Sequence, residues 1–337
     1  MTVSSNTNPE PEPDDGEYQR ALAAAATAIA GAHAVSLACH VSPDGDALGS
    51  MLGLHHVLRA ADVPCIASFS EPFVVAPHYR ELAGLDELSK PVDFPNEPEL
   101  MVTFDSGSLA RLGTLEPSAK AARELVVIDH HVSNERYGTI NVIDPQAAAS
   151  SVVVRDLVRA LGLPLNRDAA LCLFAALVCD TGRFQYDCTT PAVFDLAREL
   201  AEFDLPIATL SRTLFEEHRF QYMRLLATVI DRAELCSEQS FVWTAVTQAD
   251  LAEHDVMMEE VEGLIDVVRR TKEADVSAVL KEDPDGSVRV SLRSRGAVDV
   301  CAMAQDFGGG GHRFAAGFTS DGPIGAVVER IRGALPS

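Results

Sequence analysis

The feature that most constrains the fold is a regular alternation of short apolar segments with segments of helical spacing. The segments that predict buried strands are residues 35–40, 63–69, 100–104 and 125–128. Helical patterns separate or follow them, for example over 148–162 and 167–179. Strands that alternate with helices in this way predict an α/β fold with a parallel, doubly wound sheet. Because such sheets bind ligands beyond the carboxyl ends of their strands, polar residues at those ends are the first candidates for function.

The remainder of the chain predicts a second, smaller α/β domain. Beyond residue 233, strand patterns cover 241–246, 276–280 and 288–292, and Asp283-Pro-Asp-Gly286 has the composition of a hairpin turn. Residues 1–16 combine prolines and acids without a hydrophobic pattern, as disordered segments do. The expected organisation is a disordered acidic tail over 1–16, a first domain over 17–205, a helical connector over 206–232 and a second domain over 233–337.

Composition excludes several classes of function. The chain has 50 acidic and 27 basic residues and a formal net charge of −23, which would repel a long nucleic-acid duplex. Apolar runs end before the roughly 18 residues of a membrane span, and no signal-peptide pattern begins the chain. The seven cysteines are dispersed without a Cys-x-x-Cys pair, which fits buried thiols in a reducing compartment. We therefore expect a cytoplasmic protein without a membrane or long-duplex partner.

Four acidic clusters end apolar segments. They are His40-x-x-x-Asp44-x-Asp46, Asp105-Ser-Gly, Asp129-His130-His131 and Asp180-Thr-Gly-Arg183. Each cluster alone is also compatible with a turn or a helix cap, but their joint placement at element ends favours a metal site. Divalent cations prefer carboxylate oxygens, and imidazole adds affinity for transition metals. Several aspartates this close would repel one another unless cations lay among them, and two divalent ions would balance four of them.

A second signal is the run Gly308–Gly311, followed by His312. A glycine run exposes backbone N–H groups that can bind phosphate, and it allows a ligand to approach the backbone closely. Arg293, Arg295 and Arg313 are near in sequence and would supply positive charge. The alternative interpretation is a flexible loop with solvated arginines.

Taken together, these motifs resemble the DHH phosphoesterases with a C-terminal DHH-associated domain. The matching segments are His40-Val-Ser-Pro-Asp44-Gly-Asp46, Phe104-Asp105-Ser, Asp129-His130-His131, Asp180-Thr-Gly and Gly308-Gly-Gly-Gly-His312-x-x-Ala-Ala-Gly. The resemblance covers about residues 18–335. It is strongest to NrnA-type oligoribonucleases and phosphoadenosine phosphatases, whose relatives hydrolyse cyclic di-AMP. It implies a doubly wound catalytic domain, a smaller α/β substrate-binding domain and a homodimer.

The resemblance also implies two metal sites. One metal would be held by His40, Asp44 and Asp105. The other would be held by Asp46, Asp105, His130 and Asp180, so that Asp105 bridges the pair. Two Mn²⁺ ions per chain are implied, with Mg²⁺ or Co²⁺ as substitutes.

Further roles follow from the same resemblance. His131 would face the scissile phosphate, and Asp129 would orient the histidines, as carboxylates commonly do behind a ligating imidazole; with Asp105 they form the expected catalytic set. The expected substrate-binding residues are Gly309, Gly310, Gly311, His312, Arg295 and Arg183.

The implied activity is a two-metal phosphodiesterase that converts short oligoribonucleotides, 3′-phosphoadenosine 5′-phosphate (pAp), cyclic di-AMP or linear pApA to mononucleotides. The sequence does not rank these substrates. An inorganic pyrophosphatase is one alternative, disfavoured by the glycine-rich second domain. A RecJ-like single-strand exonuclease is another, disfavoured by the short, acidic chain. A nucleotide sensor without turnover is disfavoured by the complete metal set.

Overall fold

The computed structural model describes residues 15–336, so residues 1–14 of the expected tail lie outside it. Asp15 and Gly16, also expected in the tail, instead begin helix α1 (Asp15–Gly31). The described chain forms two compact units. The first contains the chain up to Phe73 and Leu82–Leu205, and the second contains Val74–Glu81 and the chain from Pro206. The sequence does not predict that Val74–Glu81 belongs with the second unit.

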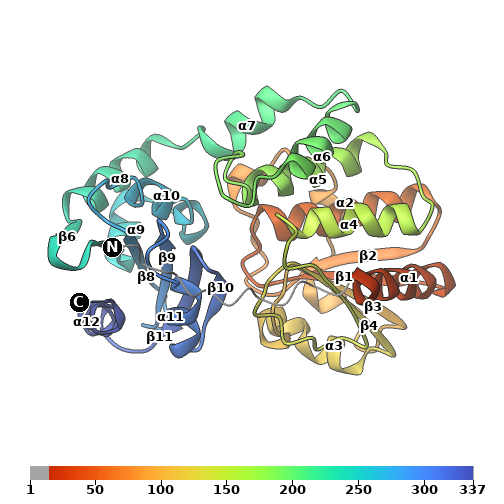
Figure 1. Cartoon of the computed structure of the whole chain (residues 1–337), viewed down its shortest axis with the longest axis horizontal. Helices are drawn as coiled ribbons and strands as arrows, with labels where there is room; N and C mark the ends of the chain where they lie inside the picture. Colours follow the sequence, from red (N-terminus) through yellow and green to blue (C-terminus); the bar gives the residue numbers. More distant parts are fainter. Residues whose placement is uncertain (1–14, 337) are drawn as a thin grey trace, which may run out of the picture. The chain divides into compact units, whose positions relative to one another are not determined.

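A parallel five-stranded sheet forms the centre of the first unit, with strand order β2-β1-β3-β4-β5 (Figure 1). Its strands are β1 (Val35–Cys39), β2 (Cys65–Phe69), β3 (Leu100–Phe104), β4 (Glu124–Asp129) and β5 (Ile140–Ile143). All four pairings are parallel, which confirms the predicted doubly wound class. The sequence did not reveal β5, because its four residues are too few to show a strand pattern.

Helices lie on both faces of this sheet. One face is covered by α2 (Gly45–Ala60) and α4 (Ser150–Ala160). On the other face, the 3₁₀ segment η4 (Leu109–Leu115) and α3 (Glu116–Ala121) pack against Ala38, Met101 and Leu125 of the strands. The first unit also contains the 3₁₀ turns η2 (Leu85–Glu87) and η3 (Pro91–Asp93), whereas η1 (Pro77–Tyr79) belongs to the second unit.

Helix α5 (Arg167–Asp180) packs against α2, and α6 (Pro191–Ala201) packs against α5. The approach of α2 to α5 is close because Gly49 and Gly53 face it. A Cβ at Gly49 would overlap the carbonyl oxygen of Cys172, and one at Gly53 would lie 2.6 Å from Leu173 Cδ2. The contacts pair the start of α2 with the end of α5, so the two helices run antiparallel and bring their polar ends together.

The second unit is built on a six-stranded sheet of order β10-β11-β9-β8-β7-β6. Its strands are β6 (Glu234–Cys236), β7 (Phe241–Val246), β8 (Val276–Glu282), β9 (Val288–Ser294), β10 (Gly310–His312) and β11 (Ala315–Ser320). Only β7 and β8 pair in parallel. The predicted hairpin through Asp283–Gly286 is confirmed, since β8 and β9 pair antiparallel.

Two apolar layers cover this sheet. On one face, α11 (Val300–Asp306) and α12 (Ile324–Ala334) contribute to a core that includes Phe241, Leu292 and Ile331. On the other, α8 (Phe220–Asp231), α9 (Gln248–His254) and α10 (Leu264–Val268) pack against β7 and β8. The unit also contains α7 (Ile207–Phe215) and the 3₁₀ turns η5 (Ser237–Gln239) and η6 (Met258–Val261). None of the described helices has the length and apolarity needed to cross a membrane.

The glycine run is not a flexible loop. Gly310, Gly311 and His312 form the edge strand β10, which pairs with Gly317, Ala316 and Ala315 of β11. A Cβ at Gly309 would overlap the carbonyl oxygen of Gly317. Close backbone packing is therefore one physical reason for glycine here, besides any contact with a ligand.

Candidate metal centre and catalytic site

The turn between β1 and α2 places the first acidic cluster. Asp44 is the N-cap of α2, and its Oδ1 accepts hydrogen bonds from the backbone N–H groups of Asp46 and Ala47, each at 3.0 Å. The helix-cap interpretation of this residue is thus correct, yet its second oxygen, Oδ2, lies 3.8 Å from His40 Nε2. One carboxylate both caps the helix and faces an imidazole.

Asp46 occupies the first turn of α2 and is fully buried. Its Oδ2 accepts a hydrogen bond from the backbone N–H of Ser150 at 2.6 Å, and its Oδ1 accepts one from Ser151 N–H at 3.2 Å. These donors form the start of α4, where helix N–H groups favour negative charge. The N-terminus of α4 thus fixes a carboxylate contributed by α2.

Asp105 follows β3 in a left-handed conformation, with φ of 54°. Aspartate tolerates this region better than most residues, and the backbone N–H is anchored to Ile128 O at 3.0 Å. Oδ1 accepts a hydrogen bond from Ser150 Oγ at 3.1 Å. The turn therefore directs a buried carboxylate over the carboxyl ends of β3 and β4.

The cluster after β4 is organised by Asp129. Its Oδ1 accepts hydrogen bonds from the backbone N–H groups of His130 and His131 and from His131 Nδ1, the last at 2.7 Å. Its other oxygen accepts from the Asn134 side chain. Asp129 is therefore committed to orienting its neighbours, and His131 is held through Nδ1.

One group of ligand atoms gathers around His40. His40 Nε2 lies 3.5 Å from Asp105 Oδ2 and 3.8 Å from Asp44 Oδ2. His40 Nδ1 faces the backbone, 2.9 Å from Val41 O, with Arg111 Nη2 at 3.1 Å. Both contacts engage Nδ1, which leaves Nε2 directed at the two carboxylates, in the position of a metal ligand.

A second group gathers around His130. His130 Nε2 lies 3.2 Å from Asp180 Oδ2, 3.4 Å from Asp105 Oδ1 and 3.6 Å from Asp46 Oδ2. Its Nδ1 is 3.1 Å from Ala147 O. The two oxygens of Asp105 are thus divided between the two groups, one toward His40 and one toward His130.

Electrostatics indicate that these groups suit cations. Burial, followed by the charges of Asp105 and Asp180, raises the pKa of Asp46 well above its ordinary value. Burial and Arg111 oppose protonation of His40, yet Asp105 and Asp44 raise its pKa to about 9. In the absence of metal, protons therefore balance part of the negative charge, as a bound cation would.

The donor set fits two divalent ions. Aspartate oxygens and imidazole nitrogens are ligands of Mn²⁺, Mg²⁺ and Co²⁺. In a six-coordinate shell with ligands about 2.1 Å from the ion, neighbouring ligand atoms are ~3 Å apart. The ligand atoms of His40, Asp44 and Asp105, and those of Asp46, His130 and Asp180, each lie within 4.8 Å of one another. Small side-chain movements would bring the ligand atoms of each set to spacings that suit one ion.

Sequence reasoning missed several residues that support this centre. Ser150 and Ser151 hold Asp46 and Asp105, Asn134 holds Asp129, and Arg111 contacts His40. The only signal was the pair Ser150–Ser151 near the start of a helical pattern, where free N–H groups are expected. The other contacts depend on tertiary structure.

The predicted substrate-binding residues lie in different places. Arg183 belongs to the turn after α5 in the first unit, whereas His312 and Arg295 belong to the second. Arg295 follows β9 and its Nη2 donates a hydrogen bond to Arg269 O at 3.3 Å. Arg293, which the sequence did not select over Arg295, shares a cross-strand row with Ala315 and His312. Since cross-strand neighbours lie on the same sheet face, Arg293 and His312 lie on one face of the sheet, separated by Ala315.

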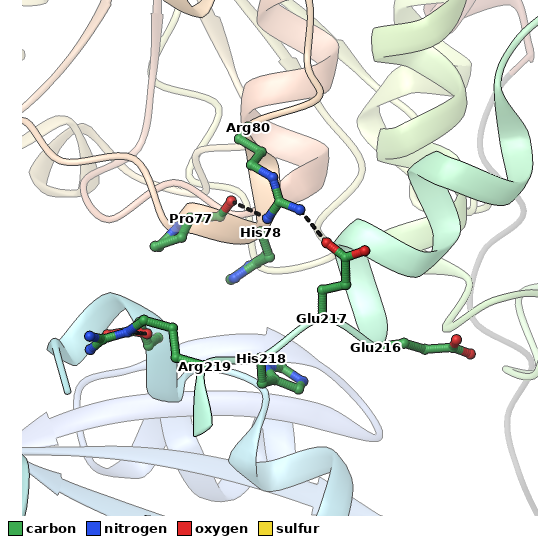
Figure 2. A pocket seen from close by; sticks show the side chains of 8 residues that line it. Pro77, His78, Arg80, Glu216, Glu217, His218 and Arg219 are labelled. Atoms are coloured by element: carbon green, nitrogen blue, oxygen red, sulfur yellow. Dashed lines mark hydrogen bonds and ion pairs between the residues drawn. The ribbon is translucent and has the colours of Figure 1, made fainter. Parts of the chain in front are cut away.

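The second unit also contains a cavity of about 500 Å³, lined by Pro77, His78, Arg80, Glu216, Glu217, His218, Arg219 and Glu260 (Figure 2). Arg80 pairs with Glu217, and Arg219 pairs with Glu260. Burial and His218 lower the pKa of His78 to about 4, so this ring is neutral at ordinary pH. Both arginines are already paired with glutamates, and no residue of the four acidic clusters lines the cavity. It is therefore a poor candidate for the catalytic site.

Comparisons with known proteins show which family the chain is similar to. A family model described as "DHH family, N-terminal domain" matches residues 34–177, and one described as "DHHA1 domain" matches residues 239–335. The chain is 33% identical over 301 residues to the "Bifunctional oligoribonuclease and PAP phosphatase NrnA" of Thermus thermophilus, covering 88% of this chain and 87% of that protein.

Two further similarities extend the comparison. The chain is 28% identical over 320 residues to the "Cyclic-di-AMP phosphodiesterase GdpP" of Geobacillus thermodenitrificans, covering 88% of this chain and 46% of that protein. The crystal structure of an exopolyphosphatase-related protein from Bacteroides fragilis has the same fold, with a TM-score of 0.83 and 23% identity over 94% of this chain and 95% of the other.

Proposed function

Since the chain belongs to the DHH family of metal-dependent phosphoesterases and carries a DHHA1 domain, we propose that it hydrolyses short oligoribonucleotides, pAp and cyclic or linear di-AMP to mononucleotides. The observation that carries the proposal is that the two carboxylate oxygens of Asp105 face different ligand groups. Its Oδ2 lies 3.5 Å from His40 Nε2, and its Oδ1 lies 3.4 Å from His130 Nε2. A single carboxylate shared by two ligand groups suits two metal ions held about 4 Å apart, as in two-metal phosphoesterases.

In this proposal, His40, Asp44 and Asp105 would hold one Mn²⁺ ion. Asp46, Asp105, His130 and Asp180 would hold the other, and Mg²⁺ or Co²⁺ would substitute. When bound, the two ions supply an activated water and neutralise charge on the phosphoryl group.

The protein's own contribution begins with His131. Asp129 accepts a hydrogen bond from the Nδ1–H of this ring. Burial lowers the pKa of His131, but the negative charge of Asp129 outweighs this effect, so the pKa is raised. A protonated ring oriented in this way can donate a hydrogen bond to a phosphoryl oxygen or a proton to the leaving oxygen. Asp129 acts as a positioning residue in either case.

Recognition of the far end of the substrate is assigned to the second domain. The row of His312, Ala315 and Arg293, with Arg295 and the glycines of β10 beside it, joins basic groups to small residues on a sheet face. Arg293 Nε is buried and has no hydrogen-bond partner in the described part of the chain, so a phosphate could satisfy it. Arg183, after Asp180, would contribute from the first domain.

The test is a substrate panel assayed with the purified protein and Mn²⁺. It contains pAp, pApA, cyclic di-AMP, oligoribonucleotides of two to 20 residues and inorganic pyrophosphate. We expect mononucleotide products and faster hydrolysis of two- to four-residue RNA than of 20-residue RNA, because the chain of net charge −23 offers no extended basic track. Cleavage of pyrophosphate alone, equal rates at all lengths, or binding without turnover would replace the proposal by one of its rivals.

We also propose a cytoplasmic homodimer. All seven cysteines are free, as expected in a reducing compartment. Helix α8 exposes three apolar side chains along one stripe. The exposed fractions are 73% for Phe220, 49% for Met223 and 40% for Ile230. An exposed apolar stripe of this kind is typical of an interface.

A further inference from the structure

The turn that follows α5 has an unusual backbone. Gly182, Arg183 and Phe184 all have positive φ values, of 54°, 62° and 62°. Only glycine adopts this region without strain, and a phenylalanine there is a genuine outlier whose cost the surrounding structure must offset. Such outliers concentrate at functional sites.

Hydrogen bonds to the end of α5 hold this conformation. The backbone N–H of Arg183 donates to Val178 O at 2.8 Å, and that of Phe184 donates to Thr181 Oγ1 at 3.2 Å. Thr181 is itself fully buried and follows Asp180 directly. The Phe184 backbone is thus fixed within one turn of Asp180, which ends the helix that contributes to the His130 ligand group.

The effect of the turn is to pair two aromatic rings near the surface. Phe184 stacks on Phe194 of α6, with ring centroids 5.4 Å apart and planes inclined by 29°. Val193 and Leu196 on the same helix are buried, whereas Phe194 is 54% exposed. A large exposed aromatic ring supported by a strained one is not explained by core packing, which would place it inside.

We infer that Phe184 and Phe194 form a stacking platform for a nucleobase of the substrate. This inference rests on the proposed function, because it needs a nucleotide whose phosphate lies at the metal centre. Flat apolar rings bind the π-face that every base presents, and they do so without hydrogen bonds to the base edge. The platform would thus favour substrates with a base while distinguishing little between bases. It would also supply affinity that the acidic chain cannot obtain from charge.

The test substitutes Phe194. Because this side chain is exposed, its replacement should leave the fold intact. Phe194→Leu keeps an apolar side chain and removes the ring, and Phe194→Trp keeps a ring. Val92→Ala truncates another exposed apolar residue of the first unit, where Val92 is 84% exposed, and serves as the matched control. Binding is measured by quenching of a 2-aminopurine dinucleotide with a non-hydrolysable linkage. Hydrolysis is measured on a dinucleotide and on its analogue that lacks the second base.

We expect Phe194→Leu to weaken dinucleotide binding and raise KM by roughly tenfold, to remove most of the quenching, and to leave hydrolysis of the base-free analogue unchanged. Phe194→Trp and Val92→Ala should match the wild type. If the wild type hydrolyses dinucleotides but Phe194→Leu binds them normally, or weakens both substrates equally, the platform is wrong and the proposed function stands. If the wild type hydrolyses no dinucleotide, the proposed function fails and the platform with it.

Discussion

At the scale of single residues, Asp105 carries the most specific chemistry. Asn at this position keeps the shape of the side chain and tolerates the left-handed φ of 54°, but it loses the charge shared by the His40 and His130 ligand groups. We expect Asp105→Asn to lower hydrolysis by roughly a hundredfold or more while the thermal unfolding midpoint changes little. Metal content and kinetics on pApA measure the two effects.

Asp93→Asn makes the same chemical change at an exposed position of η3 and should behave as the wild type. Near-normal turnover of Asp105→Asn in Mn²⁺ would refute the two-metal assignment. Loss of folding in this variant would instead show that the residue is structural.

The protonation of His40 predicts how metal binding depends on pH. Its pKa of about 9 without metal means that the ring carries a proton at neutral pH, favoured by Asp105 and Asp44 against burial and Arg111. Metal must displace that proton, and the raised pKa of Asp46 acts in the same direction. Mn²⁺ affinity should therefore rise from pH 6 toward pH 8.5, with proton release on binding. Calorimetry in buffers of different ionisation enthalpy measures both, and an affinity independent of pH would contradict this account.

Most residues of the two proposed ligand groups could be named from sequence because they lie at, or within a few residues of, the end of a predicted strand or helix. Their helpers could not. Ser150 holds Asp46 and Asp105 across intervals of 104 and 45 residues, and no local pattern encodes such a contact. For a similar reason, the sequence favours Arg295 rather than Arg293 as a substrate-binding residue. Only the strand register shows that Arg293 shares a row with His312.

At the scale of elements, the doubly wound sheet was predictable because buried parallel strands are continuous apolar runs. Strand β10 was not, because Gly310 and Gly311 have low strand propensity and pair only through close contact with β11. The close packing of α2 against α5 could likewise not be predicted from the sequence, although Gly49 and Gly53 are four residues apart on one helix face.

That helix contact gives a prediction with an internal control. A methyl group at Gly49 would meet backbone, the Cys172 carbonyl oxygen, whereas one at Gly53 would meet the flexible Leu173 side chain. Alanine gains about 1 kcal/mol over glycine in a helix, and overpacking costs ~1–3 kcal/mol. Gly53→Ala should therefore be nearly neutral, and Gly49→Ala should lower the free energy of unfolding by about 1–2 kcal/mol.

Denaturant unfolding of both variants measures this difference. Gly49→Ala should also weaken Mn²⁺ binding, because it shifts the start of α2, with Asp46, against the end of α5, with Asp180. Equal stability of the two variants would mean that α2 and α5 are free to move apart.

At the scale of the whole molecule, the proposed homodimer depends on α8. Its exposed stripe of Phe220, Met223 and Ile230 is flanked by Arg224 and Asp231, which are both exposed. Two α8 helices packed antiparallel about Ala227 and Thr228 would place each Arg224 opposite the second copy's Asp231. The arrangement is self-complementary, as a two-fold interface must be.

We therefore expect sedimentation to give twice the chain mass for the wild type, and Met223→Asp to give the single-chain mass because it introduces a charge into the apolar stripe. Met257→Asp is the matched control, since Met257 is 47% exposed, against 49% for Met223, and lies outside α8. Arg224→Asp should weaken the dimer, and adding Asp231→Arg should restore it, because the exchanged charges again attract. A wild type of single-chain mass, or a Met223→Asp variant that remains a dimer, would show that α8 is not the interface; failure of the charge exchange alone would reject the antiparallel register.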